Sequence, residues 1–303
     1  MSVDLQGLTK RFGEQFAVNN ISFTVEKGHV VGFLGPNGAG KSTTMKMLTC
    51  YTEPTAGSAT VNGFDIKKNP LEVRKSVGYL PEHNPLYKDM YVKEYLGFVA
   101  GIHKVSKSKQ RINDLIEMTG LGLEQHKLIG ALSKGYRQRV GLAQAMMHDP
   151  EVLILDEPTS GLDPNQLRDI RSLILELGKE KTVIFSTHIM QEVSALCDRV
   201  LIINRGDLVA DDPIETLHAR VNSEHQIAVE FLGKISEDKL KEIDGFKSFT
   251  KEGSTYKIIA TKDVRKEIFN WAVAQKSIII EMNAIKLSIE NVFTELTQQE
   301  KNV

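Results

Sequence analysis

The stretch from Gly35 to Ser42, GPNGAGKS, constrains the fold of this chain more than any other part of the sequence. It has the pattern G-x-x-x-x-G-K-[ST] of a phosphate-binding loop. An apolar run, Val30 to Leu34, precedes it, and Met45, Met47 and Leu48 follow at helical spacing. The loop is therefore predicted to connect a buried strand to a helix, which is the structural context that this motif requires.

The residue types of this loop suit the binding of a polyphosphate. Glycines let successive backbone N–H groups turn toward an anion, and the positive end of the following helix adds to the same site. Lys41 is predicted to contact the β- and γ-phosphates, and the Ser42 hydroxyl suits Mg²⁺. A glycine-rich turn that binds nothing is the alternative, which the predicted strand and helix disfavour. The remaining predicted binding positions of the loop are Gly35, Pro36, Asn37, Gly38, Ala39, Gly40 and Thr43.

The size and charge of the chain restrict the classes of protein to which it can belong. It has 303 residues, enough for one large domain with a small one, or for two domains. Hydrophobic residues make up 41% and charged residues 25%, an ordinary balance for a globular protein. The net charge of −1 predicts no broad electrostatic affinity for nucleic acid.

Cysteine usage and hydropathy indicate a cytosolic protein. Cys50 and Cys197 have no metal-binding spacing and are expected to be reduced. The first residues include Asp4, Lys10 and Arg11 and no apolar core, so no signal peptide is expected. No apolar run approaches the roughly 20 residues that a membrane helix needs. The chain is not expected to cross a membrane itself, and a membrane-bound partner stays compatible with this composition.

Acidic residues follow two predicted strands. Val152 to Leu155 is an apolar run that leads into Asp156 and Glu157. Asp156 suits Mg²⁺ beside Ser42, and Glu157 suits the activation of a water; a helix cap is the alternative for this pair. Glu82 follows another predicted strand, at the edge of the sheet where ligands gather, although the residues alone favour a surface carboxylate at this position.

A second possible anion site lies far along the chain. Ser133 is placed as the N-cap of a helix, and Gly135 leaves the next amides accessible. One nucleotide does not need two such sites far apart in a single chain. A dimer resolves this, because the second site would then face the nucleotide of a partner.

Two further residues are less informative from the sequence. Phe12 is either a core phenylalanine or an aromatic that stacks on a base. His188 follows the apolar strand that ends at Thr187, where a histidine by itself is more often a capping residue.

Taken together, the motifs resemble those of the ATP-binding subunits of ABC transporters. The resemblance covers roughly Val3 to Leu217, and it implies that Phe12 stacks on adenine. It also implies a P-loop NTPase fold: a RecA-like parallel sheet with an antiparallel β subdomain and a helical subdomain that carries the signature motif. The matching motifs are Walker A (Gly35 to Thr43), the signature (Leu132 to Gln138), Walker B (Val152 to Glu157), the D-loop (Ser160 to Asp163) and the switch histidine (Thr187-His188).

The chain departs from the usual family pattern at three positions. Family members usually carry glutamine where Glu82 stands, and glycine and glutamine where Lys134 and Tyr136 stand. Glutamate still offers oxygens for Mg²⁺ or water, so Glu82 is predicted to be a metal ligand with Ser42 and Asp156. These substitutions resemble a drug-export and gliding-motility subgroup of bacterial ABC-2 systems.

The sequence pattern changes after about residue 220. We predict an ATP-binding domain over residues 1–220 and an accessory domain over residues 221–303. The order strand–helix–strand–strand–helix–strand in the second predicts a small α+β, ferredoxin-like unit. A last amphipathic helix is predicted from Ser288 to Leu296. We interpret this domain as a dimerisation or regulatory unit.

The resemblance implies an ATPase that binds ATP and Mg²⁺ as a homodimer. Glu157, His188 and Lys41 are then the catalytic residues, and Ser133 and Gly135 contact the nucleotide of the partner chain. A polytopic membrane permease is the expected second partner, contacted through the loop around Glu82 to Met90, with the subunit on the cytoplasmic face of the cell membrane. Export is the expected direction. The alternative is a soluble ABC ATPase that acts as a nucleotide-gated regulatory module. DNA-repair ABC ATPases fit less well, because they need a long coiled-coil insertion between the phosphate loop and the signature. Translation ABC ATPases fit less well, because they usually join two ATPase domains in one chain.

Overall fold

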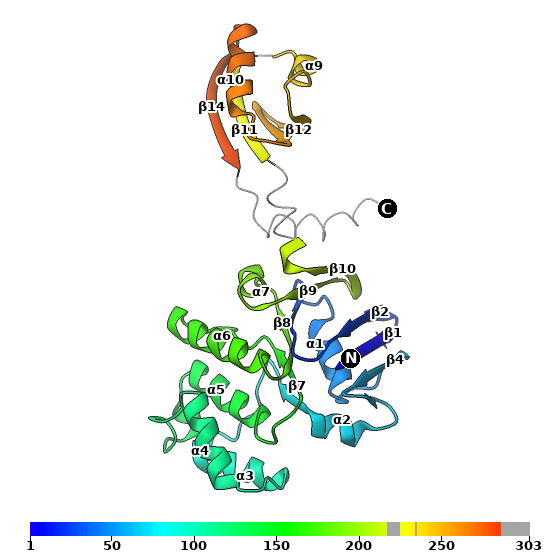
Figure 1. The fold of residues 1–303 in the computed structure, drawn as a ribbon, viewed down its shortest axis with the longest axis vertical. Helices are drawn as coiled ribbons and strands as arrows, with labels where there is room; N and C mark the ends of the chain where they lie inside the picture. The colour runs from blue at the N-terminus through cyan, green and yellow to red at the C-terminus, as the bar shows by residue number, and fades with distance from the viewer. Residues whose placement is uncertain (217–224, 234, 286–303) are drawn as a thin grey trace. The chain divides into compact units, whose positions relative to one another are not determined.

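The computed structural model describes residues 1–216, 225–233 and 235–285 of the chain. It divides into two compact units, Met1–Ile214 and Glu215–Val303, each of which is drawn in Figure 1. The predicted domain boundary at residues 220 and 221 and the predicted helix from Ser288 to Leu296 lie outside the described residues.

The first unit is organised around a six-stranded sheet. Its order is β10-β9-β3-β8-β7-β6, and all neighbouring pairs are parallel except β9 and β10. Every residue of β3, β7 and β8 is buried, as expected for a parallel sheet covered on both faces. This burial explains why the three strands are nearly continuous apolar runs in the sequence. The strands are β3 (Val30–Leu34), β6 (Val77–Leu80), β7 (Val152–Asp156), β8 (Thr182–Thr187), β9 (Arg199–Asn204) and β10 (Asp207–Pro213).

A second sheet of the first unit is antiparallel, in the order β2-β1-β4-β5. Helix α1 (Lys41–Leu48) contacts β2 and β4 of this sheet and β7 of the central sheet. Met45, Met47 and Leu48 of α1 are fully buried and belong to the same hydrophobic cluster as both sheets. The helix that follows the phosphate loop is therefore fixed between two sheets. The strands are β1 (Val3–Phe12), β2 (Gln15–Val25), β4 (Ala56–Val61) and β5 (Phe64–Asp65).

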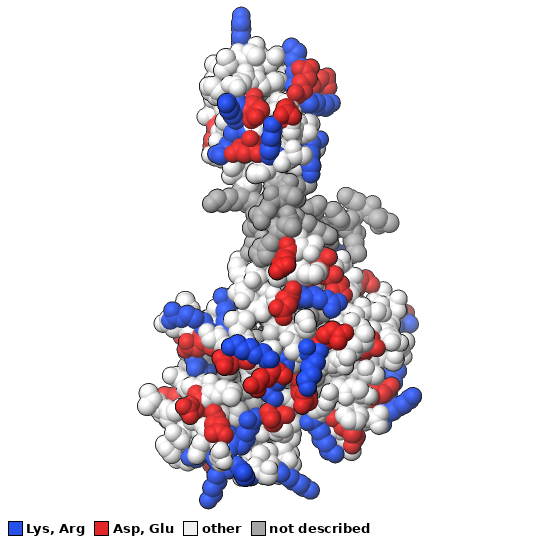
Figure 2. Space-filling view, in the orientation of Figure 1, with Lys and Arg blue, Asp and Glu red and all other residues white. Residues whose placement is uncertain are grey.

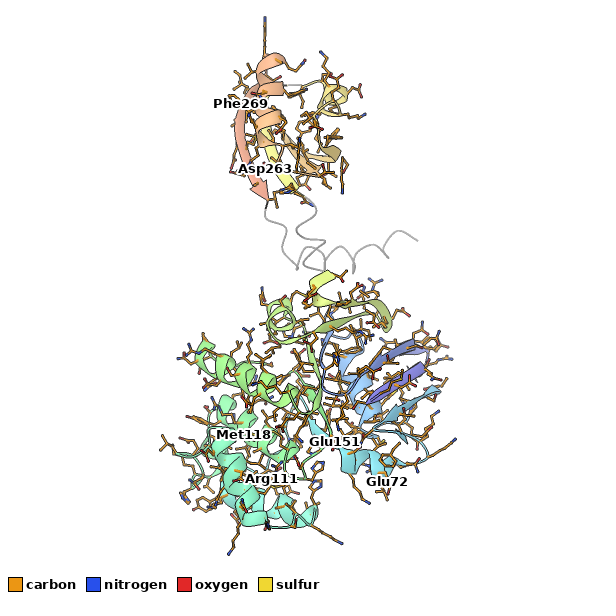
Figure 3. All side chains as sticks on the ribbon, in the orientation of Figure 1. Glu72, Arg111, Met118, Glu151, Asp263 and Phe269 are labelled. Atoms are coloured by element: carbon orange, nitrogen blue, oxygen red, sulfur yellow. The ribbon has the colours of Figure 1, made fainter. Side chains whose placement is uncertain are left out.

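Helices cover the rest of the central sheet and form a separate lobe. In Figure 1, α3, α4 and α5 lie together in the lobe, and α6 and α7 lie beside the sheet. Arg111 of α4, labelled in Figure 3, donates to the Met146 carbonyl over 2.6 Å and so ties the lobe to the segment that leads into β7. The helices are α2 (Pro70–Ser76), α3 (Val92–Ile102), α4 (Ser108–Met118), the 3₁₀ turn η1 (Ile129–Ala131), α5 (Lys134–Ala145), α6 (Pro164–Gly178) and α7 (Met190–Leu196).

The second unit has the predicted ferredoxin-like order of elements. Its sheet is antiparallel, in the order β12-β13-β11-β14. One hydrophobic cluster joins Ile227, Val229 and Phe231 of β11 to Ile268 and Ala272 of α10. The elements are β11 (His225–Leu232), α9 (Glu237–Leu240), β12 (Phe246–Glu252), β13 (Thr255–Ala260), α10 (Arg265–Ala274) and β14 (Ile278–Ile285).

The predicted fold class is confirmed. A helix begins at Ile214, directly after β10, and the last residue of β10, Pro213, pairs with Arg199 at the edge of the sheet. Proline is tolerated there because an edge strand does not need every N–H group. Among the described residues, no helix is long and apolar enough to cross a membrane. On the face shown in Figure 2, acidic and basic side chains are interspersed over both units.

A stacked histidine pair connects the helical lobe to the central sheet. The rings of His103 and His148 stack at a centroid distance of 4.2 Å, and His148 Nε2 lies 3.1 Å from the Val77 carbonyl oxygen. Burial, together with the charge of His103, lowers the pKa of His148 to about 4. A histidine in an unfolded chain has a pKa of about 6.5, so the unfolded chain binds a proton that the native chain excludes.

We therefore expect the free energy of unfolding to fall as the pH is lowered from about 6.5 to about 4. His148→Phe keeps a ring against His103 and removes the titration, so this fall should become shallower. His83→Gln is the matched control, since the His83 side chain is 93% exposed. Urea unfolding between pH 7 and pH 4.5 measures the difference; an unchanged pH dependence in His148→Phe would contradict the assignment.

Candidate functional site

The strand order brings the predicted site residues together at one edge of the central sheet. β8 lies between β3 and β7, with Leu34 opposite Thr187 and Asp156 opposite Ser186. The carboxyl ends of the three strands therefore end side by side, where ligands of open parallel sheets bind. A cavity of about 400 Å³ opens at this edge. It is lined by Gln15, Ala17, Asn37, Gly38, Gly40, Lys41, Ser42, Thr43, Glu82, Glu157, Ser160 and His188.

The phosphate loop has the predicted conformation, between β3 and α1. Gly38 and Gly40 have φ angles of +79° and +113°, which side chains rarely allow. A Cβ atom on Gly40 would lie 2.4 Å from the Ala17 carbonyl oxygen, so both the φ angle and the space require glycine there. The Thr44 N–H donates to the Gly40 carbonyl over 2.9 Å and continues the helix from the loop. The first turn of α1 thus directs its N–H groups toward the cavity.

Lys41 lies inside the curve of this loop. Its side chain is 6% exposed and Nζ donates to the carbonyls of Gly35 and Pro36, over 2.8 and 3.2 Å. Nζ also forms an ion pair with Glu157 Oε1 at 3.5 Å. The ammonium group is therefore held at the centre of the loop by neutral carbonyls and one carboxylate. An anion that enters the loop meets a positioned positive charge.

Asp156 is the acidic residue at the end of β7. Its Oδ1 accepts one hydrogen bond from Ser42 Oγ over 3.1 Å and one from Ser186 Oγ over 2.5 Å. The buried carboxylate therefore contacts the hydroxyl of Ser42, and Ser42 itself lines the cavity. In the described part of the chain, no group of three or more His, Cys, Asp or Glu residues forms a metal cage. The donor set fits Mg²⁺, which needs few protein ligands because it keeps water and binds substrate phosphates.

Glu157 and His188 form the other side of the cavity. Glu157 has a φ angle of +51°, a strained value for a residue with a side chain. Its backbone N–H donates to Ser186 Oγ over 3.0 Å, and its Oε2 lies 3.0 Å from His188 Nδ1. The carboxylate is thus held between an ammonium group and an imidazole. This arrangement can orient a water and stabilise negative charge at the mouth of the phosphate loop.

Not all predicted residues line this cavity. The Phe12 ring, at the end of β1, is 56% exposed, and Lys10 Nζ lies 5.0 Å from its centroid. Ser133 caps α5, with its Oγ accepting from the Tyr136 N–H over 3.3 Å, and Gly135 packs closely against the Gln166 side chain. Glu82 does line the cavity, beside the phosphate loop. Phe12, Ser133 and Gly135 therefore lie outside the lining of this cavity, and their predicted contacts with nucleotide stay predictions.

Three residues of the site were not predicted from the sequence: Gln15, Ala17 and Ser186. Ser186 is the most informative of them, because it contacts Asp156 and Glu157 together. A serine near the end of an otherwise apolar strand was the available signal. Its partners could not be inferred without knowing that β8 lies next to β7.

Sequence comparisons place the chain among known proteins. A family model described as ABC transporter matches residues 18–160. The ABC transporter ATP-binding protein NatA of Bacillus subtilis is 42% identical over 212 residues, which cover 69% of this chain and 86% of that protein. The bacitracin transport ATP-binding protein BcrA of Bacillus licheniformis is 40% identical over 218 residues, which cover 70% of each chain.

The fold is also similar to solved structures. That of cbiO1 from Clostridium perfringens, described as part of the ABC transporter complex cbiONQ, superposes with a TM-score of 0.66 at 27% identity. The match covers 72% of this chain and 90% of that one. The shared part corresponds in extent to the first unit of this chain.

Ser186→Ala tests the hydrogen-bond geometry described above. The substitution leaves Asp156 without one donor and the buried Glu157 N–H with a poorer partner, which should lower the free energy of unfolding by about 1–3 kcal/mol. Ser172→Ala, at an exposed position on α6, is the matched control. Urea unfolding measures both; equal effects of the two substitutions would contradict the proposed importance of Ser186.

Proposed function

The chain belongs to the family of ABC transporter ATP-binding proteins, and we propose on this basis that it binds and hydrolyses ATP as a homodimer and thereby drives a separate membrane permease. The observation that carries the proposal is the convergence of Lys41, Glu157 and His188 on one cavity, beside the Ser42–Asp156 contact. A cavity of about 400 Å³ is within the range of small-ligand sites.

The phosphate loop is the proposed binding site of the triphosphate. Its backbone N–H groups and the N-terminus of α1 surround the phosphates, and Lys41 contacts the β- and γ-phosphates. The Lys41 ammonium group contacts two loop carbonyls and Glu157. We infer that the phosphates replace these partners, which leaves the Glu157 carboxylate free to bind a water. Phe12 is the proposed stacking partner of the adenine ring.

The catalytic roles follow from the positions of the charged groups. Glu157 accepts a hydrogen bond from the attacking water and aligns it with the γ-phosphate. His188, next to Glu157, and Lys41 stabilise the charge of the transferring phosphoryl group. Ser42, Asp156 and Glu82 are the proposed protein ligands of Mg²⁺, which when bound neutralises part of the phosphate charge.

Dimerisation completes the site in this proposal. Ser133 and Gly135 lie at the N-terminus of α5, outside the lining of the cavity, and they can contact a γ-phosphate that is bound to a second copy of the chain. Nucleotide then contacts these residues only in the closed dimer. This differential affinity is what shifts the equilibrium toward closure, and loss of the γ-phosphate removes it.

The surface near the Glu82–Met90 loop is the proposed contact with the permease. A second cavity, of about 390 Å³, is lined there by Tyr51, Pro81, Pro85 and His103 among others. Tyr51 is 77% exposed, and the Tyr87 and Phe98 rings pack together at 5.6 Å while remaining exposed. Exposed aromatic groups around a hollow are typical of protein-binding surfaces. Because Glu82 lines the nucleotide cavity, movement at the nucleotide can reach this surface.

The kind of transport is inferred from the relatives. BcrA is named for bacitracin transport, and cbiO1 is described as part of a transporter complex. We propose export by an assembly in which this subunit lies on the cytoplasmic face of the cell membrane. The exported cargo or the driven process could serve gliding motility, which is a variant of the same transport proposal. The alternative is a nucleotide-gated regulatory module that does not bind a permease.

Affinity purification from detergent-solubilised membranes separates transport from the regulatory alternative. The wild-type chain should retain a polytopic membrane protein, and a Tyr51→Ser, Phe98→Ser variant should lose most of it. Leu175→Ser, at an exposed position on α6, is the control that should leave it bound. Absence of any polytopic protein with the wild-type chain would favour the regulatory module.

Glu157→Gln tests the hydrolysis site. The amide preserves the shape of the side chain but is a poor acceptor for the proton of water, so the ATP hydrolysis rate should fall by about 100-fold or more. ATP binding should persist, and the variant should accumulate as a dimer with ATP, measured by sedimentation. Glu176→Gln, exposed on α6, is the matched control. Hydrolysis by Glu157→Gln at the wild-type rate would refute the assigned role.

A further inference from the structure

A buried carboxylate lies behind the nucleotide cavity, outside its lining. Glu192, near the start of α7, is 0% exposed. Its Oε2 accepts a hydrogen bond from Thr187 Oγ1 over 2.6 Å, and its Oε1 has no hydrogen-bond partner among the described residues. An ionisable group in the interior costs several kcal/mol of desolvation, and an apolar side chain of similar volume would avoid this cost. Stability alone therefore does not account for a glutamate at this position.

Thr187, the partner of Glu192, contacts the phosphate loop and the turn that carries His188. Its carbonyl accepts from the N–H of Gly35, the first residue of the phosphate loop, over 3.3 Å. Its Oγ1 accepts from the N–H of Ile189 over 3.0 Å. Thr187 and Ile189 are the residues on either side of His188. The hydrogen bond from the Ile189 N–H to Thr187 Oγ1 therefore links the two residues that flank His188.

The Glu192 carboxylate determines the direction of the Thr187 hydroxyl. A hydroxyl group has one proton and two acceptor lone pairs. With its proton directed to Glu192, Oγ1 presents a lone pair to the Ile189 N–H. The Glu192 N–H also donates to the Ile189 carbonyl, over 3.2 Å, which fixes the other end of the same turn. Two contacts from one residue therefore hold the turn that carries His188.

His188 depends on this turn, because packing holds its side chain only weakly. The side chain is 45% exposed, yet Nδ1 lies 3.0 Å from Glu157 Oε2. A half-exposed ring keeps such a position only if its backbone is well fixed. We propose that Glu192 is a positioning residue for His188: through Thr187, it sets the turn that places the imidazole beside Glu157. The inference rests on the proposed function, since it assumes that His188 acts in hydrolysis.

Two pairs of variants separate positioning from packing. Glu192→Met fills the volume without an acceptor, and Glu192→Gln keeps an oxygen for the Thr187 hydroxyl. Thr187→Val removes the hydroxyl at nearly constant shape, and Thr187→Ser retains it. Glu192→Met and Thr187→Val should each lower kcat for ATP hydrolysis by about 10- to 100-fold with KM almost unchanged, as expected for a small misplacement of a reacting group. Glu192→Gln and Thr187→Ser should restore most of the rate.

A double-mutant cycle with His188→Ala completes the test. If Glu192 acts through His188, Glu192→Met should cause little further loss of kcat in the His188→Ala background. Full additivity of the two losses, or equal rates for Glu192→Met and Glu192→Gln, would overturn the proposal. If Glu192→Met does not fold, the Thr187→Val and Thr187→Ser pair carries the same cycle.

The His188→Ala rate distinguishes a wrong role for Glu192 from a wrong role for His188. If His188→Ala hydrolyses ATP at the wild-type rate, the role of His188 itself is wrong, and this inference is overturned with it. If His188→Ala is impaired while Glu192→Met and Thr187→Val are not, the positioning role alone is refuted.

Discussion

The parallel pairing of β3, β8 and β7 is the constraint on which the whole site depends. Leu34 lies opposite Thr187, and Asp156 lies opposite Ser186. A displacement by one residue in either pairing would turn each of these side chains to the other face of the sheet. The phosphate loop, the acidic pair and the switch histidine would then no longer meet. The complete burial of the three strands stabilises this register, because side chains on both faces of the sheet are buried.

Much of this arrangement could be predicted because the motifs carry their own chemistry. The phosphate loop required a strand before it and a helix after it, and the acidic pair required the end of a strand; the structure has both. What the sequence could not supply was adjacency in space. Ser186 and Glu192 act through partners on other elements, and no spacing pattern marks such partners.

Lys41 and Glu157 are paired charges inside the proposed nucleotide site. Each charge is buried, and each has the other as a partner at 3.5 Å. Removing one partner from such a pair costs free energy, because it leaves a buried charge unpaired. A phosphate that binds Lys41 in place of Glu157 therefore requires a new contact for the Glu157 carboxylate. In our account this contact is the attacking water, with His188 on the other side. The signature residues Ser133 and Gly135 stay outside this cavity, which is why we place the remaining contacts of the nucleotide on a second copy.

If each complete site combines the phosphate loop of one chain with the signature residues of another, two inactive variants should restore activity when they are mixed. Lys41→Ala damages only the loop, and Ser133→Arg damages only the signature. In a mixed dimer one site carries both defects and the other site carries neither. The mixture should therefore hydrolyse ATP although each variant alone does not. A mixture that stays as inactive as its components, while the wild-type chain hydrolyses ATP under the same conditions, would rule out a site shared between two chains.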